Sequence, residues 1–338
     1  MRPARLTRRA LGSASLALGL VTSGLHMPAL AQGPVPIRLM LDWLPNGDYG
    51  AYYLGLERGF WREVGIDLTI ERGFGSSDTV TKIAAGTAPF GIADIAALMT
   101  GRLRGQTPVK AIASIYTRPP HAIFTLAEGP IRSLKDLEGR SLAGAPGSSV
   151  RVMLPLVLRR NNVDITRINL VNSEPATMVP LLMTSRADAV TSFVTNTPRF
   201  EAQARQINRT IRVLAFSETL QIYGNSVIAS EATLAQNPEL VRRFTAATIR
   251  SLEAARQAPR AAIEAMMRVI PGMNLEIDTG QMEIVNSLTF DSPVARSNPI
   301  GSFEAAQLRR TWEAVAEAQG FEVSQADPDS FVARGFPA

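Results

Sequence analysis

LDWLPN at residues 41–46 leads through YGAYY at 49–53 into ERGFW at 57–61 and VGI at 64–66. An apolar run at Ile37–Leu41 comes just before and predicts a buried strand. Trp43 and Asn46 follow that strand, in a loop that Pro45 restricts. Ligands of α/β proteins gather beyond the carboxyl ends of strands, and an indole offers a flat apolar surface with one N–H donor. Trp43 and Asn46 are therefore candidate ligand contacts, although a tryptophan packed between strand and helix gives the same pattern.

This stretch resembles the N-terminal part of periplasmic solute-binding proteins of the SsuA/ThiY-like family. That family carries aliphatic sulfonates, nitrate and thiamine pyrimidine precursors to ABC importers, and the eukaryotic pyrimidine synthases are related to it. The resemblance extends from Ile37 to about Phe244. It implies an α/β fold, the two-lobed periplasmic binding protein of type II, with mixed, largely parallel sheets, a central cleft and a helical C-terminal tail.

Residues 1–31 have the three parts of an export signal peptide. Four arginines lie among residues 2–9, a modestly apolar stretch covers Leu11–Leu20, and Ala29-Leu30-Ala31 offers a cleavage site. Arg8-Arg9 fits a twin-arginine (Tat) signal, and paired arginines are also common in general secretory (Sec) signals, so both routes stay open. Because the apolar stretch falls short of the roughly 20 residues that span a bilayer, we expect export without a membrane anchor.

Composition excludes several classes of function. The chain of 338 residues has a formal charge of +5, and residues 1–31 hold four arginines and no acidic residue, which leaves +1 for residues 32–338. Such a balance does not indicate a nucleic-acid or membrane-surface partner. The absence of cysteine excludes disulfides, thiolate metal sites and a lipid-modified cysteine. A carrier without a lipid anchor needs an outer membrane to retain it, so we expect the periplasm.

Short apolar runs alternate with helical patterns up to about Ala229, and mostly helical signals follow. The predicted strands are Ile37–Leu41, Asp67–Ile70, Phe90–Ile92, Val109–Ile115, Ala122–Leu126, Ser141–Ala143, Ile168–Val171, Ala189–Phe193, Ile211–Ala215 and Val227–Ala229. The predicted helices include Thr79–Ala85, Val150–Arg159, one that starts at Asn237-Pro238 and a last one from Ser302 to Gly320. With the resemblance, this order predicts lobe 1 at 36–121 and 229–335, lobe 2 at 122–228, and hinges near 119–123 and 223–227.

Two glycine-serine loops precede predicted helices, at Gly73–Ser77 and at Gly147–Ser149. Glycine lets the backbone approach a ligand and a helix N-terminus offers free N–H groups, so facing loops suit an anion or a ring oxygen. Ordinary helix capping explains either loop alone. Asp94 follows a short predicted strand, and either accepts hydrogen bonds from a ligand amine or caps the helix at Ile95. The predicted ligand contacts are Trp43, Asn46, Tyr49, Ser76, Ser77, Asp94, Tyr116, Gly147, Ser148, Ser149, Phe193, Asn196 and Tyr223.

Catalytic signals are missing from the sequence. The related synthases use a lysine for pyridoxal phosphate, a reactant histidine and a cysteine-rich iron motif. Aligned on them, the chain has Ala93 at the lysine and Ala97 at the histidine, and no cysteine at 220–224. His121 is the only histidine after the signal and is expected to be structural. We therefore expect no enzyme activity, no cofactor and no metal.

The pyrimidine carriers, which the 41–46 motif resembles most, have a tryptophan and an acidic residue soon after an Asp-Ala-Val strand. This chain has neither between Asp188 and Glu201, so a cationic pyrimidine loses its expected carboxylate there. We expect a monomeric carrier that closes on a small planar or anionic solute, such as a pyrimidine, sulfonate, nitrate or aromatic acid. Its partner would be an ABC permease with its ATPase. An enzyme on the same scaffold and a sensory subunit are the alternatives.

Overall fold

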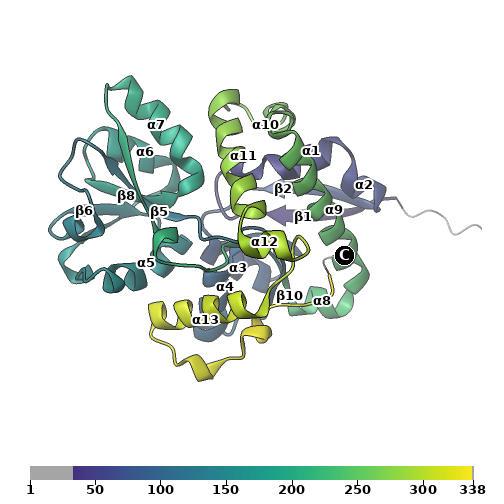
Figure 1. Ribbon diagram of the computed structural model, residues 1–338. Coiled ribbons are helices and arrows are strands. Elements are labelled where there is room, and N and C mark those ends of the chain that lie inside the picture. Colours follow the sequence, from purple (N-terminus) through teal and green to yellow (C-terminus); the bar gives the residue numbers. More distant parts are fainter. Residues whose placement is uncertain (1–32, 337–338) are drawn as a thin grey trace, which may run out of the picture. The chain divides into compact units, whose positions relative to one another are not determined.

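The computed structural model describes residues 33–336, so the predicted signal peptide lies outside the described residues. The described part is built on two sheets, with strand orders β2-β1-β3-β10-β4 and β7-β6-β8-β5-β9 (Figure 1). The strands are β1 (Val35–Met40), β2 (Ile66–Glu71), β3 (Phe90–Asp94), β4 (Val109–Ser114), β5 (His121–Leu126), β6 (Ser141–Gly144), β7 (Asn169–Asn172), β8 (Ala189–Phe193), β9 (Ile211–Ala215) and β10 (Asn225–Ser230). Every predicted strand is present, with ends that differ by at most two residues.

The sheets are mixed and largely parallel, as predicted: in each sheet four strands run in one direction and one strand, β10 or β5, runs against them. β1 pairs parallel with β2 and β3, and β6 does so with β7 and β8. β10 pairs antiparallel with β3 and β4, and β5 does so with β8 and β9. β5 and β10 each follow a crossing of the chain between the sheets and insert against the direction of their neighbours. We call each sheet with its helices a lobe.

The two crossings lie side by side. They follow β4 and β9, and the Gly224 amide donates a hydrogen bond of 2.9 Å to the Tyr116 carbonyl. Residues 225–228, the end of the range predicted for lobe 2, pair in the first sheet instead. The sequence indicated only the apolar residues Val227–Ala229 as a strand. The strand begins two residues earlier, with the buried polar residues Asn225 and Ser226, so its start was not predicted. The position of a hinge stays a prediction.

Helices cover both sheets, and the last ones reach both lobes. The first lobe carries α1 (Gly50–Glu57), α2 (Phe60–Glu63), α3 (Ser76–Ala84), α4 (Ile95–Gly105), α8 (Glu231–Gln236), α9 (Pro238–Gln257) and α10 (Pro259–Met267), and the second carries α5 (Ser149–Arg160), α6 (Met178–Met183) and α7 (Thr197–Gln206). The chain ends with α11 (Leu275–Phe290), α12 (Pro293–Ser297) and α13 (Ala305–Gln319). α11 packs against α10 and α7, and α13 packs against α4 and α5 (Figure 1). The C-terminal helices therefore connect the lobes.

A single hydrophobic cluster runs from one lobe to the other through these helices. It includes Leu98 of α4, Leu154 of α5 and Trp312 of α13, all with side chains that are almost fully buried. The Trp312 indole also donates a hydrogen bond of 2.8 Å to the Val323 carbonyl, which satisfies its only polar group. This shared core holds the two lobes together on the side where α4, α5 and α13 pack.

The last helix starts later than the sequence predicted. α13 begins at Ala305 rather than at Ser302, because the Glu304 carboxylate accepts hydrogen bonds from the Ala306 and Gln307 amides and caps the first turn. It ends as predicted at Gly320, whose φ of 72° closes the helix in the left-handed region.

A stacked aromatic pair attaches α9 to the first sheet and gives a test of the fold. Phe244 of α9 lies 3.9 Å, centroid to centroid, from Phe90 of β3, and both side chains are fully buried. Phe244→Ala removes this packing and is expected to lower the free energy of unfolding by about 3–5 kcal/mol, measured by urea denaturation. Val269→Ala changes a side chain that is 60% exposed and should change stability by less than about 0.5 kcal/mol. Equal effects of the two substitutions would contradict this packing.

Candidate functional site

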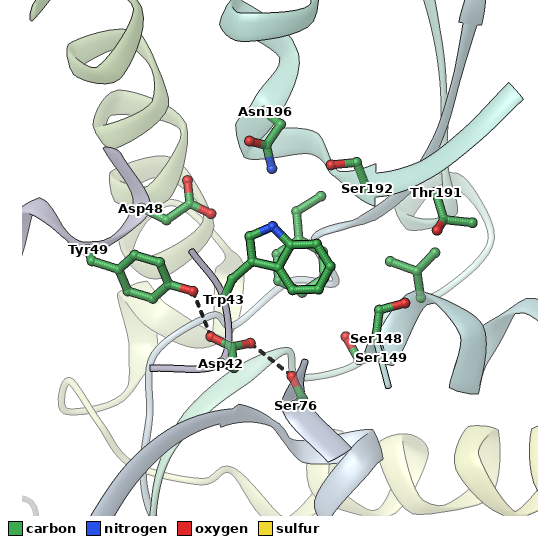
Figure 2. A pocket seen from close by; sticks show the side chains of 12 residues that line it. Asp42, Trp43, Asp48, Tyr49, Ser76, Ser148, Ser149, Thr191, Ser192 and Asn196 are labelled. Atoms are coloured by element: carbon green, nitrogen blue, oxygen red, sulfur yellow. Dashed lines mark hydrogen bonds between the residues drawn. The ribbon is translucent and has the colours of Figure 1, made fainter. Parts of the chain in front are cut away.

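Loops from both lobes enclose a cavity, which we call the inner cavity. It lies beyond the carboxyl ends of β1, β2, β6 and β8, where the sheet topology places ligands. Figure 2 shows the Trp43 indole at its centre. The lining residues are Asp42, Trp43, Asp48, Tyr49, Ser76, Ser148, Ser149, Val150, Thr191, Ser192, Phe193 and Asn196.

Asp42 lies on the first-lobe side of the inner cavity and is almost fully buried. Its carboxylate accepts hydrogen bonds of 2.8 Å from the Tyr49 hydroxyl and from the Ser76 hydroxyl (Figure 2), and one of 3.2 Å from the Asn225 amide. Burial removes water from the charged form and raises the pKa of Asp42 to about 6, although these donors favour the ionised state. Three segments distant in sequence are thus fixed around one carboxylate.

Asp48 is a second buried carboxylate in the lining. One oxygen accepts a hydrogen bond of 2.7 Å from the Thr195 hydroxyl, which belongs to the other lobe. The other oxygen, Oδ1, is buried and has no hydrogen-bond partner among the residues that the structure describes. Burial is again the main cause that raises the pKa of Asp48, to about 7. This oxygen is therefore a buried acceptor that no described residue satisfies.

Aromatic rings give the inner cavity flat walls. Trp43 and Phe193 are partly buried, and Tyr49 is buried with its hydroxyl fixed on Asp42. Among the described residues that line this cavity, none carries a basic side chain. The Ser148 hydroxyl is buried and is likewise unpaired within residues 33–336. Rings, two carboxylates and hydroxyls together suit a planar molecule that carries N–H groups.

The two glycine-serine loops face each other, but they bond to each other and to Asp42. The Ser77 amide donates a hydrogen bond of 3.1 Å to the Gly147 carbonyl. Gly75 has a φ of 130°, and a Cβ atom there would lie 2.6 Å from the same carbonyl oxygen, so only glycine fits this approach. The Ser76 hydroxyl donates to the Asp42 carboxylate. The loops therefore offer fewer free donors to an anion than the sequence predicted.

The structure brings Trp43, Tyr49, Ser76, Ser148, Ser149, Phe193 and Asn196 together in the lining, whereas the other predicted contacts lie outside it. Asp94 caps α4 by accepting a hydrogen bond of 2.8 Å from the Ala96 amide, which was the alternative role. Tyr116 is buried in the first-lobe core. Tyr223 packs edge-to-face on Phe303, and its hydroxyl accepts a hydrogen bond from the Glu304 amide. The sequence could not separate these packing roles from ligand contact at a strand end.

Asn46, Ser77 and Gly147 lie around the inner cavity without lining it. Asn46 donates a hydrogen bond of 3.4 Å to the Asn196 side chain, and Gln281 donates one of 2.9 Å to the same oxygen. This amide cluster and the Ser77–Gly147 bond hold the two lobes together at the rim.

His121 has contacts that superficially resemble a catalytic triad. Its Nε2 atom lies 3.2 Å from the Ser149 hydroxyl and 3.0 Å from the Asp94 carboxylate, and the ring is fully buried. A serine–histidine–aspartate relay needs the acid on one ring nitrogen and the serine on the other. Here both partners share one nitrogen, so the geometry is that of a structural hydrogen bonder.

The sequence reasoning missed Asp42, Asp48, Val150, Thr191 and Ser192, which also line the inner cavity. Asp42 directly precedes Trp43 at the end of the first strand, so the strand-end rule that selected Trp43 applied equally to it. Asp48 lies only two residues beyond Asn46, at the start of a helix. The sequence therefore did contain a signal for Asp42 and Asp48, namely a polar residue next to or near a predicted ligand contact.

Within residues 33–336, no helix is long and apolar enough to cross a membrane. The same residues contain no group of three or more histidine, aspartate or glutamate side chains arranged to hold a metal ion.

Two lobes of matching strand order, with a cavity at the strand ends between them, define a bilobal α/β binding-protein fold. The alkanesulfonate-binding protein SsuA of Xanthomonas axonopodis pv. citri, bound to MOPS, has this fold, with a TM-score of 0.67, 15% identity, and coverage of 91% of this chain and 98% of that one. The family model described as NMT1/THI5 like matches residues 46–262, and the chain belongs to that family.

Two curated relatives are named for what they bind. The riboflavin-binding protein RibY of Chloroflexus aurantiacus is 25% identical over 313 residues, which cover 88% of this chain and 86% of RibY. The formylaminopyrimidine-binding protein of Halalkalibacterium halodurans is 27% identical over 155 residues, 46% of each chain.

The raised pKa of Asp48 gives a pH test of the site. Its folded-state pKa of about 7 exceeds the ordinary aspartate pKa of 3.8, so between these values the folded protein binds the proton more tightly than the unfolded chain does. Stability therefore falls as pH rises from about 4 to 7, with a slope of up to about 1.4 kcal/mol per pH unit from this group. Asp48→Asn should remove that part of the slope, and its stability relative to the wild type should rise with pH. Urea denaturation at several pH values measures this.

Asp67→Asn, which removes an exposed carboxyl on β2, is the matched control for the loss of one carboxyl group. A constant difference in stability between the wild type and Asp48→Asn from pH 5 to pH 8 would contradict the assignment.

Proposed function

We propose that this chain is the solute-binding component of an ABC importer and closes on a planar heterocycle that carries N–H donors. The observation that carries this proposal is the pair of buried carboxylates, Asp42 and Asp48, in a cavity whose lining has no basic side chain. A buried carboxylate favours a hydrogen-bond donor or a cation as its partner.

The same charge argument disfavours the anionic solutes that the sequence left open. A sulfonate, nitrate or carboxylate in the inner cavity would lie beside two carboxylates and lose its water without gaining a cation. Asp48 Oδ1 instead suits an N–H group of an uncharged or positively charged ring. The pyrimidine carriers have an acidic residue in the segment that corresponds to residues 188–201, and this chain does not. Asp42 and Asp48 would supply a carboxylate to the ligand in its place.

The walls of the cavity support a flat ligand. Aromatic rings prefer offset stacking or edge-to-face contact with other rings, and Trp43 and Phe193 present such surfaces. Riboflavin and formylaminopyrimidine, which the two named relatives bind, are both planar and rich in nitrogen. We favour this class for the chain, and the individual compound stays open.

Export and partners complete the proposal. Residues 1–31 would direct the chain to the periplasm by the Sec or Tat route, and the protein would act there as a monomer. A permease with its ATPase would receive the ligand and supply the energy, so the carrier itself needs no cofactor. A sensory role would use the same cavity with a different partner.

The alternative is an enzyme on the same scaffold, related to the pyrimidine synthases. Alanines at positions 93 and 97, where those synthases have lysine and histidine, speak against it. The buried His121 is already held by Ser149 and Asp94. Consumption of a bound heterocycle by the purified protein, without any transporter, would favour the enzyme.

Thermal unfolding of residues 32–338 tests the ligand class. We expect riboflavin, lumiflavin or aminopyrimidines to raise Tm, and alkanesulfonates and nitrate to leave it unchanged. A ligand at about a hundred times its Kd stabilises the folded state by roughly 2.7 kcal/mol, which raises Tm by several degrees. A shift caused only by sulfonates or nitrate would overturn the proposed class.

Substitution of the unpaired carboxylate tests the contact itself. Asp48→Asn keeps an oxygen for Thr195 but removes the charge, and should weaken binding of the heterocycle about 10- to 100-fold, measured by calorimetry. Trp43→Ala and Ser148→Ala should also weaken binding without unfolding the protein. Asp67→Asn serves as the matched control. Unchanged affinity in all three cavity variants would place the ligand elsewhere.

A further inference from the structure

A second and larger cavity lies next to the inner cavity. We call it the outer cavity. Trp43, Ser192 and Asn196 line both cavities. Figure 2 shows the Ser192 and Asn196 side chains on one side of the Trp43 indole, and these two residues also line the outer cavity.

The walls of the outer cavity combine apolar and neutral polar groups. Met178, Val179 and Met183 of α6 contribute flexible or branched apolar surface. Asn46 and Gln203 add side-chain amides, which donate and accept hydrogen bonds. Such a lining suits a flexible chain with polar substituents better than it suits a second aromatic ring.

The charge in the outer cavity is balanced. Arg199 lines it and donates a hydrogen bond of 2.7 Å to the buried carboxylate of Asp278. The same carboxylate accepts hydrogen bonds from the Gly47 and Asn274 amides. A guanidinium held in this way has little uncompensated charge for a phosphate, but its other N–H groups can donate hydrogen bonds to neutral oxygens such as hydroxyls.

We propose that the ligand has two parts: a planar N–H-bearing head in the inner cavity and a neutral, hydroxylated tail in the outer cavity. The head follows from the proposed function, on which this inference rests. The tail follows from the outer cavity alone, from its continuity with the inner cavity at Ser192 and Asn196 and from its balanced charge. The substrate class is then a heterocycle with a polyol-like substituent rather than a bare pyrimidine.

Riboflavin and lumiflavin separate the two parts, because they share the ring system and its N–H group and differ in the tail. Quenching of flavin fluorescence measures both affinities. We expect riboflavin to bind the wild type about tenfold more tightly or better, since the tail gains hydrogen bonds in the outer cavity. Riboflavin 5′-phosphate should bind no more tightly than riboflavin. Tighter binding of the phosphate would overturn the neutral tail.

Ala176→Trp tests the place of the tail. Ala176 is exposed and lines only the outer cavity, so a large ring there should fill the space without unfolding the protein. The variant should bind lumiflavin as the wild type does and lose the preference for riboflavin. Ala235→Trp, at an exposed position of α8 outside both cavities, is the matched control and should keep that preference.

The outcomes distinguish the two proposals. Equal binding of riboflavin and lumiflavin to the wild type, binding of aminopyrimidines alone, or an Ala176→Trp variant that keeps the preference or weakens both flavins equally would overturn the tail and leave the proposed function standing. A wild type that binds neither flavins nor aminopyrimidines would overturn the proposed function, and the tail with it.

Discussion

The site depends on the buried carboxylate of Asp42. Burial of a charge costs several kcal/mol unless hydrogen bonds replace its water, and here Tyr49, Ser76 and Asn225 supply them. These donors come from the start of α1, the start of α3 and the start of β10, so the carboxylate orients three elements at once. The Ser76 hydroxyl also accepts a hydrogen bond from the Asp94 amide, which extends the network to the end of β3. Because Asp42 directly precedes Trp43 in the chain, the network that holds Asp42 also positions the backbone of Trp43.

The sequence predicted the fold well because its strands are short apolar runs between clear turns. The glycine-serine loops were also correctly expected to face each other across the lobes, as the Ser77–Gly147 bond shows. What failed was the choice among polar and aromatic residues at strand ends. Tyr223 and Phe193 carry the same signal, yet one packs under Phe303 and the other lines the cavity. That difference depends on distant residues, which a local pattern does not contain.

Asp48 illustrates another limit of the sequence. Its burial arises because Thr195 of the other lobe and Gln281 and Asp278 of α11 approach the turn at Gly47. None of these residues is near position 48 in the sequence. The desolvation that shifts its pKa is therefore a property of the assembled lobes, and no local motif predicts it.

The close approach of Gly75 and Gly147 has a consequence for the lifetime of the bound state. In the proposed binding cycle the lobes would separate only after the Ser77 amide leaves the Gly147 carbonyl, and both groups would then need water as a partner. A hydrogen bond with a net worth of about 1 kcal/mol that breaks before the ligand leaves slows dissociation about fivefold. Ser77 and Gly147 line neither cavity, so the bond would lengthen the residence time of every ligand alike. The contact between the glycine-serine loops would thus govern how long a ligand stays, and the residues that line the inner cavity would govern which ligand binds.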